Sequence, residues 1–90
     1  MYELEVSKEA KKAFNKAQFR VQTRINDCLA YLIDFGTYGS PYPIKPLKGR
    51  FQKFNYYEAK IDKDYRIIFR REGDTFYIRA AGTHNDLKTG

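Results

Sequence analysis

The final third of the chain contains three short apolar runs separated by turn residues, and this pattern limits the possible folds more than any other feature. The runs cover residues 54–61, 65–71 and 75–82, with connections at 62–64 and 73–74. Apolar residues that alternate with polar ones at a period of two are typical of strands with one buried face. Connections this short favour antiparallel hairpins. The pattern therefore predicts a three-stranded meander with one apolar face and one cationic face.

The N-terminal part of the chain predicts a strand followed by helical structure. Residues 2–6 alternate between polar and apolar, and Ser7 is a typical helix N-cap. Apolar residues then recur at helical spacing from Lys8 until about Phe35, and Gly36 ends the pattern. No Gly or Pro divides this stretch, so one bent helix and a two-helix hairpin are both open. We prefer the hairpin, because one helix of about 28 residues would span about 42 Å, too long for so small a domain.

The order of these elements is β-α-α-β-β-β, with residues 37–46 as a loop rich in Gly, Ser and Pro. Such an order predicts an α+β domain in which two N-terminal helices pack on one face of an antiparallel sheet. Residues 1–90 are expected to form a single domain, because a chain of 90 residues has no room for a second core. The other face of the sheet is left for a ligand or a partner.

The register of the first hairpin follows from its apolar residues, because a slip of one residue would turn every core side chain outward. The apolar faces match only if Ile61 lies opposite Tyr65. That pairing places Lys60 directly across from Arg66 on the other face. Like charges that face each other across strands are destabilising, so this pair favours an anion between the two side chains.

The second hairpin turns at residues 73–74. Its register is expected to place five pairs side by side: Ile78 and Phe69, Ala80 and Ile67, Arg79 and Ile68, Tyr77 and Arg70, and Gly82 and Tyr65. The same register brings Thr83 and His84 to the level of Asp64 and Lys63.

The cationic face of the meander gathers these side chains: Lys60, Arg66, Arg70, Arg79, Tyr77 and Glu58. His84 is the only histidine of the chain, and it is expected to lie with Asp64 at one end of this face. A solvated charged face and a phosphate-binding face both fit the cations. The histidine favours phosphate, because an imidazole titrates near neutral pH and exchanges a proton with a ribose hydroxyl or a leaving 5′-oxygen more readily than Lys or Arg.

The charge balance and the single cysteine bear on partners and location. Lys and Arg outnumber Asp and Glu by 17 to 11, and the net charge of +6 favours polyanions or an acidic protein partner.

One cysteine, Cys28, excludes an internal disulfide and a Cys-based zinc site, so we expect a buried, inert helix residue. Residues 1–6 lack the pattern of a signal peptide, and no apolar run approaches membrane-spanning length. A cytosolic location is the simplest expectation.

Three segments of the chain resemble the RelE/ParE superfamily of toxin–antitoxin proteins: residues 45–49, 57–68 and 81–87. The ending Gly-Thr-His-Asn-Asp-Leu at residues 82–87 is most similar to the YafQ branch of RelE-type mRNA interferases. The resemblance covers nearly the whole chain in element order, and its last third is motif-specific. It implies a cytoplasmic type II toxin that cleaves messenger RNA on the translating 70S ribosome without a metal or another cofactor. It also implies a hetero-oligomer with a cognate antitoxin that is acidic and binds DNA.

The resemblance implies roles for individual residues. His84 matches the catalytic histidine of the YafQ branch, Asp64 matches its acidic active-site residue, and Arg66 matches an arginine that RelE uses for phosphate. Lys60 stands where the YafQ pattern has a histidine and RelE has a lysine, and it would stabilise charge on the phosphate. Further residues expected to bind RNA phosphates are Lys45, Arg79, Arg70 and Lys88.

Besides Lys60, two more of these positions depart from the YafQ pattern in residue type. Lys45 stands where that pattern has a further histidine, and Lys88 stands where an aromatic or large apolar residue is usual. The implied reaction is attack of the messenger's 2′-hydroxyl on its own 3′-phosphate, giving a 2′,3′-cyclic phosphate and a 5′-hydroxyl. His84 would be the general acid for the leaving oxygen, with Asp64 orienting it or assisting as a base.

Two other functions fit the same pattern. A ParE-type toxin would have the same fold and inhibit DNA gyrase by binding, and it would not need His84 beside Asp64. A non-catalytic basic module would bind RNA or an acidic peptide through Lys60 and Arg66 with a strong salt dependence, and His84 would have no role.

An aromatic-rich helical surface is expected at Tyr31, Phe35 and Tyr38. Aromatic residues at helical spacing are more often ordinary core, which is the preferred interpretation here. The alternative is a surface that receives apolar anchors of an antitoxin.

Overall fold

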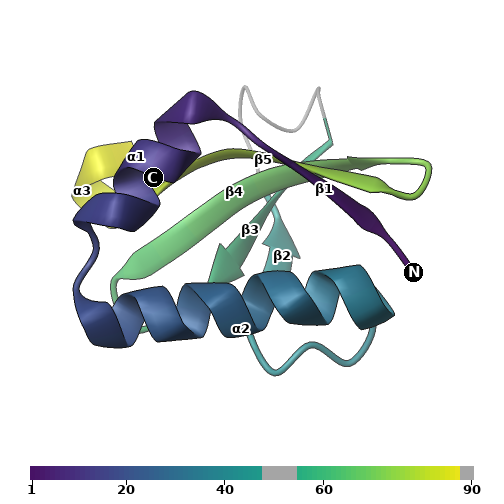
Figure 1. Ribbon diagram of the computed structural model, residues 1–90, viewed down its shortest axis with the longest axis horizontal. Helices are drawn as coiled ribbons and strands as arrows, with labels where there is room; N and C mark the ends of the chain where they lie inside the picture. Colours follow the sequence, from purple (N-terminus) through teal and green to yellow (C-terminus); the bar gives the residue numbers. More distant parts are fainter. Residues whose placement is uncertain (48–54, 88–90) are drawn as a thin grey trace.

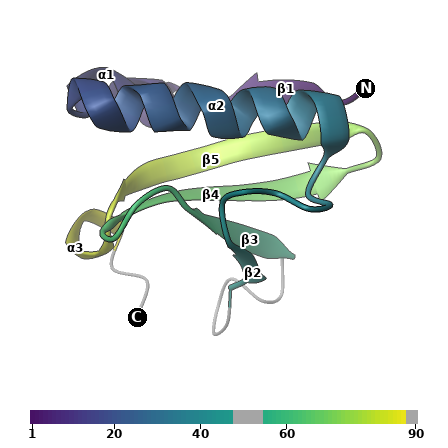
Figure 2. The ribbon, with the colours of Figure 1, turned by 90° about the horizontal axis from the view of Figure 1, so that it is seen from below.

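The computed structural model describes residues 1–47 and 55–87, with His84 described by its backbone only (Figure 1). In chain order the elements are β1 Glu3–Val6, α1 Lys8–Lys16, α2 Phe19–Phe35, β2 Ile44–Pro46, β3 Tyr56–Lys60, β4 Tyr65–Glu72, β5 Thr75–Thr83 and α3 His84–Leu87. The strands form a sheet in the order β1-β5-β4-β3-β2, and α1 and α2 cover one of its faces (Figure 2). The predicted α+β class, with two N-terminal helices on one sheet face, is confirmed.

The sheet has two features that the sequence pattern did not predict. β1 pairs in parallel with β5, so the sheet is mixed, while the other neighbouring strands are antiparallel. β2 lies inside the stretch expected to be loop and pairs with the edge of β3. An edge strand tolerates Pro46, because proline lacks an N–H and an edge strand needs to donate on one side only.

The two-helix hairpin is confirmed, with extended backbone at Ala17 between the helices. Ser7 caps α1, because its Oγ accepts a hydrogen bond from the Ala10 N–H at 3.0 Å. At the other end of α1, the Gln22 side chain of α2 donates from Nε2 to the Phe14 carbonyl at 2.9 Å. This bond satisfies a terminal carbonyl of α1, so the helices separate without a Gly or Pro. No helix in the described part of the chain is long and apolar enough to cross a membrane.

The core lies between α2 and the sheet. α2 contributes a buried stripe of Val21, Ile25, Cys28 and Leu32. This stripe packs with apolar residues of β3, β4 and β5, among them the fully buried Phe69 and Phe76. Burial, together with the nearby Asp27 carboxylate, raises the pKa of the Cys28 thiol to about 12. Cys28 is therefore the buried and unreactive helix residue that was expected.

The aromatic surface at the end of α2 is largely outside the core. Phe35 is 62 % exposed and Tyr38 is 89 % exposed. Tyr31 is half-buried, and its hydroxyl donates to the Tyr38 carbonyl at 2.6 Å. The core interpretation is therefore wrong for Phe35 and Tyr38.

The register of the first hairpin is confirmed. Lys60 pairs with Arg66, and the Ile61 N–H donates to the Tyr65 carbonyl at 2.9 Å. β3 ends at Lys60 and β4 begins at Tyr65, so residues 61–64 connect the two strands, and the hydrogen bond from Ile61 to Tyr65 places these two residues opposite each other as predicted.

The register of the second hairpin is correct near its turn and wrong beyond it. Phe69 pairs with Ile78 as predicted, but a β-bulge follows, and Ile68 pairs with Ala80. Arg79 is the extra residue, so it does not lie beside Ile68. The Ser7 hydroxyl, at the end of β1, donates to the Arg79 carbonyl at 2.6 Å and so stabilises the bulge.

The bulge changes which residues of β5 face the helices. Ala81 pairs with Ile67 and is buried, and Thr83 pairs with Tyr65 where Gly82 was expected. Without the bulge, Gly82 would occupy the core side and leave less apolar contact there. His84 follows Thr83 directly, and Asp64 directly precedes Tyr65, so both residues lie just beyond the Tyr65–Thr83 pair.

Candidate functional site

Charged side chains gather at one corner of the sheet face that α1 and α2 leave open. We call this the open-face corner: Lys45, Glu58, Lys60 and Arg66. Strand pairing sets Lys45 across from Glu58 and Lys60 across from Arg66. The alternate residues of β3 and β4 belong to the core under the helices, so these side chains project from the other face. The predicted juxtaposition of Lys60 and Arg66 is present.

Glu58 places a negative charge beside Arg66. It is only 7 % exposed, and its Oε1 lies 3.3 Å from Arg66 Nε and 3.8 Å from Lys45 Nζ. The buried carboxylate therefore lies between Lys45 and Arg66 and lowers the repulsion between those two cations. That an anion binds between Lys60 and Arg66 stays a prediction.

Arg66 is oriented by several groups at once. Besides its ion pair with Glu58, its Nη1 donates to the Asp62 carbonyl at 3.2 Å and to the Lys63 carbonyl at 3.4 Å. Among the described residues its Nη2 has no hydrogen-bond partner, and Lys60 is exposed without an ion pair. Lys60 and one edge of the Arg66 guanidinium are therefore the groups most available to an incoming phosphate.

Asp64 lies on the turn between β3 and β4, and Asp62 fixes that turn. Asp62 Oδ1 accepts hydrogen bonds from the Asp64 N–H at 2.9 Å and the Tyr65 N–H at 2.8 Å. These two bonds hold the pKa of the Asp62 carboxyl below its usual value. Asp64 itself is exposed, and in the described part of the chain no ion pair joins it to Lys60 or Arg66. Asp62 was not identified from the sequence as the residue that positions Asp64. An Asp whose side chain accepts from the N–H two residues later is typical of an Asx-turn, so the signal was present in the sequence.

The turn that carries His84 is held by Thr83 and Asp86. The Thr83 N–H donates to Asp86 Oδ2 at 3.1 Å, and the Asp86 N–H donates to Thr83 Oγ1 at 3.2 Å. A Cβ on Gly82 would lie 2.9 Å from the Asp86 Cβ, so this close approach requires glycine. Gly82, Thr83 and Asp86 therefore set the backbone position of His84, which belongs to the same Gly-Thr-His-Asn-Asp-Leu stretch.

The remaining residues expected to bind RNA lie elsewhere. Arg70 pairs with Glu72 and lies over the Tyr77 ring, 4.4 Å from its centroid. Arg79 is exposed, with its guanidinium 5.7 Å from the centroid of the Tyr56 ring. These arginines line a hollow of about 320 Å³ beside β1 rather than the open-face corner. Lys88 lies outside the described residues.

No protein-family model matches the chain, and no curated protein sequence does. Several solved structures do. The crystal structure of YafQ from E. coli strain BL21(DE3) superimposes with a TM-score of 0.80 at 20 % identity, covering 97 % of this chain and 98 % of that one. The E. coli DinJ–YafQ complex gives 0.80 at 23 % identity, with the same coverage of 97 % and 98 %. The RelB–RelE antitoxin–toxin complex from Methanococcus jannaschii gives 0.76 at 20 % identity, covering 92 % and 93 %. Over nearly its whole length, the chain therefore has the fold of the RelE/YafQ-type toxins.

Proposed function

We propose that this chain is the toxin of a type II toxin–antitoxin system and an endoribonuclease that cleaves messenger RNA on the translating ribosome in the cytoplasm. One observation supports the proposal: Lys60 pairs with Arg66 and Tyr65 pairs with Thr83, so Asp64 and His84 each lie one residue beyond the last β4–β5 pair, at the same end of the sheet. The fold shared with YafQ and RelE supports the same assignment.

The proposed reaction needs one proton donor and several cations. The 2′-oxygen of the RNA forms a bond to the adjacent phosphorus and releases its proton, while the bond from phosphorus to the 5′-oxygen breaks. His84 gives a proton to that leaving oxygen. Asp64 takes the proton of the 2′-hydroxyl, or it orients His84 while that proton passes to water. Lys60 and Arg66 stabilise the charge on the pentacoordinate phosphorus. The products are a 2′,3′-cyclic phosphate and a 5′-hydroxyl.

The other cations hold the RNA on either side of the reacting phosphate. Lys45 is 73 % exposed in its side chain and shares Glu58 with Arg66, so it extends the open-face corner along β2. Arg70 and Arg79 are proposed to bind the backbone further along the face, and Lys88 is proposed to do the same from the C-terminal segment. Sequence-independent phosphate contacts of this kind make binding strongly salt-dependent.

We propose a cognate antitoxin as the protein partner, in a hetero-oligomer with this chain. The E. coli DinJ–YafQ structure is a toxin–antitoxin complex, and the M. jannaschii RelB–RelE structure is an antitoxin–toxin complex. The net charge of +6 makes an acidic antitoxin the complementary partner, and a DNA-binding function would belong to the antitoxin.

The assignment is tested by His84→Ala, with Asn85→Ala as the matched control in the same helical turn. Cleavage of ribosome-bound messenger is measured by primer extension, and the 3′ ends are examined for a cyclic phosphate. Loss of a general acid is expected to slow cleavage by about 100-fold or more, whereas Asn85→Ala keeps the wild-type rate. Undiminished cleavage by His84→Ala would contradict the assignment. Gyrase inhibition in a supercoiling assay, with no RNA cleavage by the wild-type protein, would favour the ParE-type function instead.

A further inference from the structure

A hollow of about 320 Å³ lies on the open face of the sheet, beside β1. A row of paired residues crosses four neighbouring strands at this place: Glu5 of β1, Tyr77 of β5, Arg70 of β4 and Tyr56 of β3. Strand alternation puts the row on the same face as the open-face corner, four residues further along β4. At about 3.3 Å per residue, the two places are about 13 Å apart. Arg79 also lines the hollow, and we call this place the Arg–Tyr hollow.

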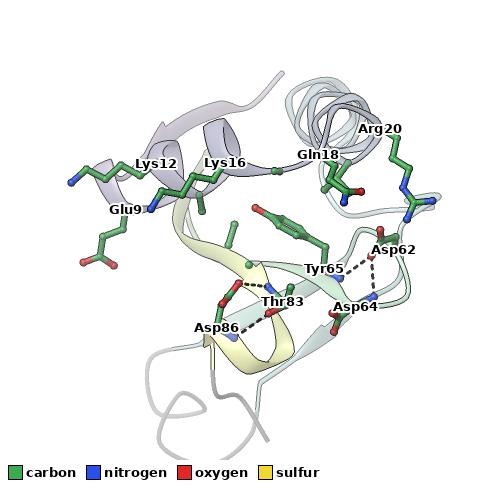
Figure 3. Close-up of a pocket in the computed structure, with 15 residues that line it drawn as sticks. Glu9, Lys12, Lys16, Gln18, Arg20, Asp62, Asp64, Tyr65, Thr83 and Asp86 are labelled. Carbon is green, nitrogen blue, oxygen red and sulfur yellow. Dashed lines mark hydrogen bonds between the residues drawn. The ribbon is translucent and has the colours of Figure 1, made fainter.

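The Arg–Tyr hollow is separate from a larger cavity of about 640 Å³ on the helix side of the sheet (Figure 3). Asp64, Thr83 and Asp86 line that cavity, so it adjoins the candidate site, and its rim carries both cations and carboxylates. None of its lining residues lines the Arg–Tyr hollow. A ligand of the hollow is therefore selected by a different set of side chains.

In the Arg–Tyr hollow, each arginine lies over a tyrosine ring. Arg70 Cζ is 4.4 Å from the centroid of the Tyr77 ring, and Arg79 Cζ is 5.7 Å from that of the Tyr56 ring. Arg79 is the extra residue of the β-bulge, and the hydrogen bond from the Ser7 hydroxyl to its carbonyl holds its backbone in place. Tyrosine rings and guanidinium planes are the surfaces on which unstacked RNA bases stack.

The charges around the Arg–Tyr hollow balance. Arg70 forms an ion pair with Glu72, and the exposed Glu5 lines the hollow from β1. Two carboxylates therefore stand against two guanidinium groups, whereas the open-face corner has three cations and only Glu58 as a carboxylate. A balanced set of charges gives no net attraction for a phosphate inside the hollow, and a neutral base needs none.

The size of the hollow and the position of Glu5 favour a single base, and among the bases guanine. A volume of about 320 Å³ is at the small end of ligand sites in proteins. A carboxylate accepts two parallel hydrogen bonds. Guanine presents two adjacent donors, N1–H and the N2 amino group, on its Watson–Crick edge. Uracil presents one donor there, and the amino groups of adenine and cytosine lie next to a ring acceptor that a carboxylate repels.

We propose that the Arg–Tyr hollow binds one unstacked base of the RNA, with a preference for guanine. The base stacks against the two Arg–Tyr pairs, and its Watson–Crick edge donates two hydrogen bonds to Glu5. The inference rests on the proposed function, because the RNA is the substrate, and it adds recognition of a base at about 13 Å from the Lys60–Arg66 pair. The N–H groups of Arg70 and Arg79 that are not used in the hollow are left for the backbone of the same nucleotide.

Binding is measured by fluorescence polarisation on the full-length protein with labelled oligomers of ten 2′-deoxy abasic units, which have no 2′-hydroxyl and so cannot undergo the proposed cleavage. One oligomer has no base, and four others carry a single guanine, adenine, cytosine or uracil at the same internal unit. The guanine oligomer is expected to bind about 5-fold or more tightly than the oligomer without a base. It is expected to bind about 3-fold or more tightly than each of the other three.

Two variants test the assigned contacts, each with a matched control. Tyr77→Leu keeps an apolar side chain but removes the flat ring, so the advantage of the guanine oligomer over the oligomer without a base is expected to fall by about 3-fold or more. Tyr38→Leu, at an exposed position outside the hollow, keeps that advantage. Glu5→Gln removes the paired acceptors, so the preference for guanine over uracil is expected to be lost. Glu3→Gln removes the same charge from the same face of β1 and keeps the preference.

The proposal is overturned if the oligomers with and without a base bind equally, because the hollow would then hold only backbone. It is also overturned if folded Tyr77→Leu keeps the wild-type advantage, or if Glu5→Gln keeps the preference for guanine. Thermal unfolding shows whether each variant is folded, and the comparison of oligomers on the wild-type protein decides the proposal without the variants.

Cleavage of ribosome-bound messenger is assayed separately, so the base site and the proposed function fail in different ways. Wild-type protein that binds the guanine oligomer with the expected preference but cleaves no messenger would refute the nuclease and leave the base site intact. Cleavage of messenger without base-dependent binding would overturn the base site alone.

Discussion

Glu58 determines how the cations of the open-face corner act. An arginine whose carboxylate partner is almost fully buried is held in one orientation, and part of its charge is already neutralised. A phosphate that approaches Arg66 must therefore share it with Glu58, whereas Lys60 carries no such restraint. Sequence alternation placed Glu58 on this face correctly, but its burial depends on its neighbours on β2 and β4, which no local pattern encodes.

The substitution Glu58→Gln tests this arrangement. Loss of the carboxylate leaves the partly buried Arg66 without its counter-charge, which is expected to lower the free energy of unfolding by about 1–3 kcal/mol. The same change releases Arg66 and Lys45 toward phosphate, so the affinity for a single-stranded RNA oligonucleotide is expected to rise a few-fold at low salt. Urea unfolding and fluorescence polarisation measure the two effects. Glu3→Gln, at an exposed position of β1, is the control for loss of one negative charge.

The two outcomes of Glu58→Gln are independent. Unchanged stability would mean that Arg66 is satisfied by the Asp62 and Lys63 carbonyls alone. Weaker RNA binding would mean that Glu58 is needed to orient Arg66, and that orientation outweighs the gain in charge.

At the scale of elements, two short turns position the candidate chemistry, and side-chain bonds to the backbone fix both. The Asp62 side chain accepts hydrogen bonds from the Asp64 and Tyr65 N–H groups and so fixes the β3–β4 turn that contains Asp64. Thr83 and Asp86 exchange hydrogen bonds around the first turn of α3, where His84 lies. In both cases an acidic residue acts on the backbone and thereby sets the place of the residue assigned to catalysis.

The contribution of Asp62 is expected to depend on pH. Hydrogen bonds from the Asp64 and Tyr65 N–H groups lower the pKa of Asp62 in the folded chain below its usual value of 3.8. A carboxyl whose folded pKa is depressed contributes stability that is fully present above the unfolded pKa and is lost as the pH falls through the folded pKa. Asp62→Asn is therefore expected to lower the free energy of unfolding by about 1 kcal/mol at pH 7. The difference from wild type should shrink as the pH falls below about 3.8.

Urea unfolding at pH 7 and at pH values down to 3 checks this expectation, with Asp74→Asn in the other hairpin turn as the control. A difference between Asp62→Asn and wild type that stays constant over this range would show that the carboxylate charge is not what holds the turn.

The sequence predicted those features of the fold that are determined by residues close to one another in the chain. The β3–β4 register followed from strict alternation of apolar residues, and the α1 start followed from the cap at Ser7. The bulge at Arg79 was not predictable, because it depends on a hydrogen bond from Ser7, 72 positions away in the sequence. β2 and α3 span three and four residues, too short for any periodicity to show.

At the scale of the whole molecule, the cations are distributed over both sides of the sheet. The open-face corner lies on one side, and the lysines of α1 with Arg20 lie on the other. With a net charge of +6, both sides attract polyanions at long range, so net charge alone does not tell which side would bind the RNA of the proposed function.

A pair of charge-matched substitutions distinguishes the two sides. Lys60→Gln on β3 and Lys11→Gln on α1 each remove one positive charge, and both lysines are exposed. If RNA lies on the open face, Lys60→Gln removes a phosphate contact, and the slope of log K against log salt concentration falls by about 0.7. Lys11→Gln acts only through the general field, which is screened at a Debye length of about 8 Å near physiological salt, so its slope stays close to wild type. Binding of a single-stranded RNA oligonucleotide is measured by fluorescence polarisation over a range of salt concentrations. Equal slopes for the two variants would show that RNA is attracted by net charge rather than held at the open-face corner, and the nuclease assignment would lose its substrate site.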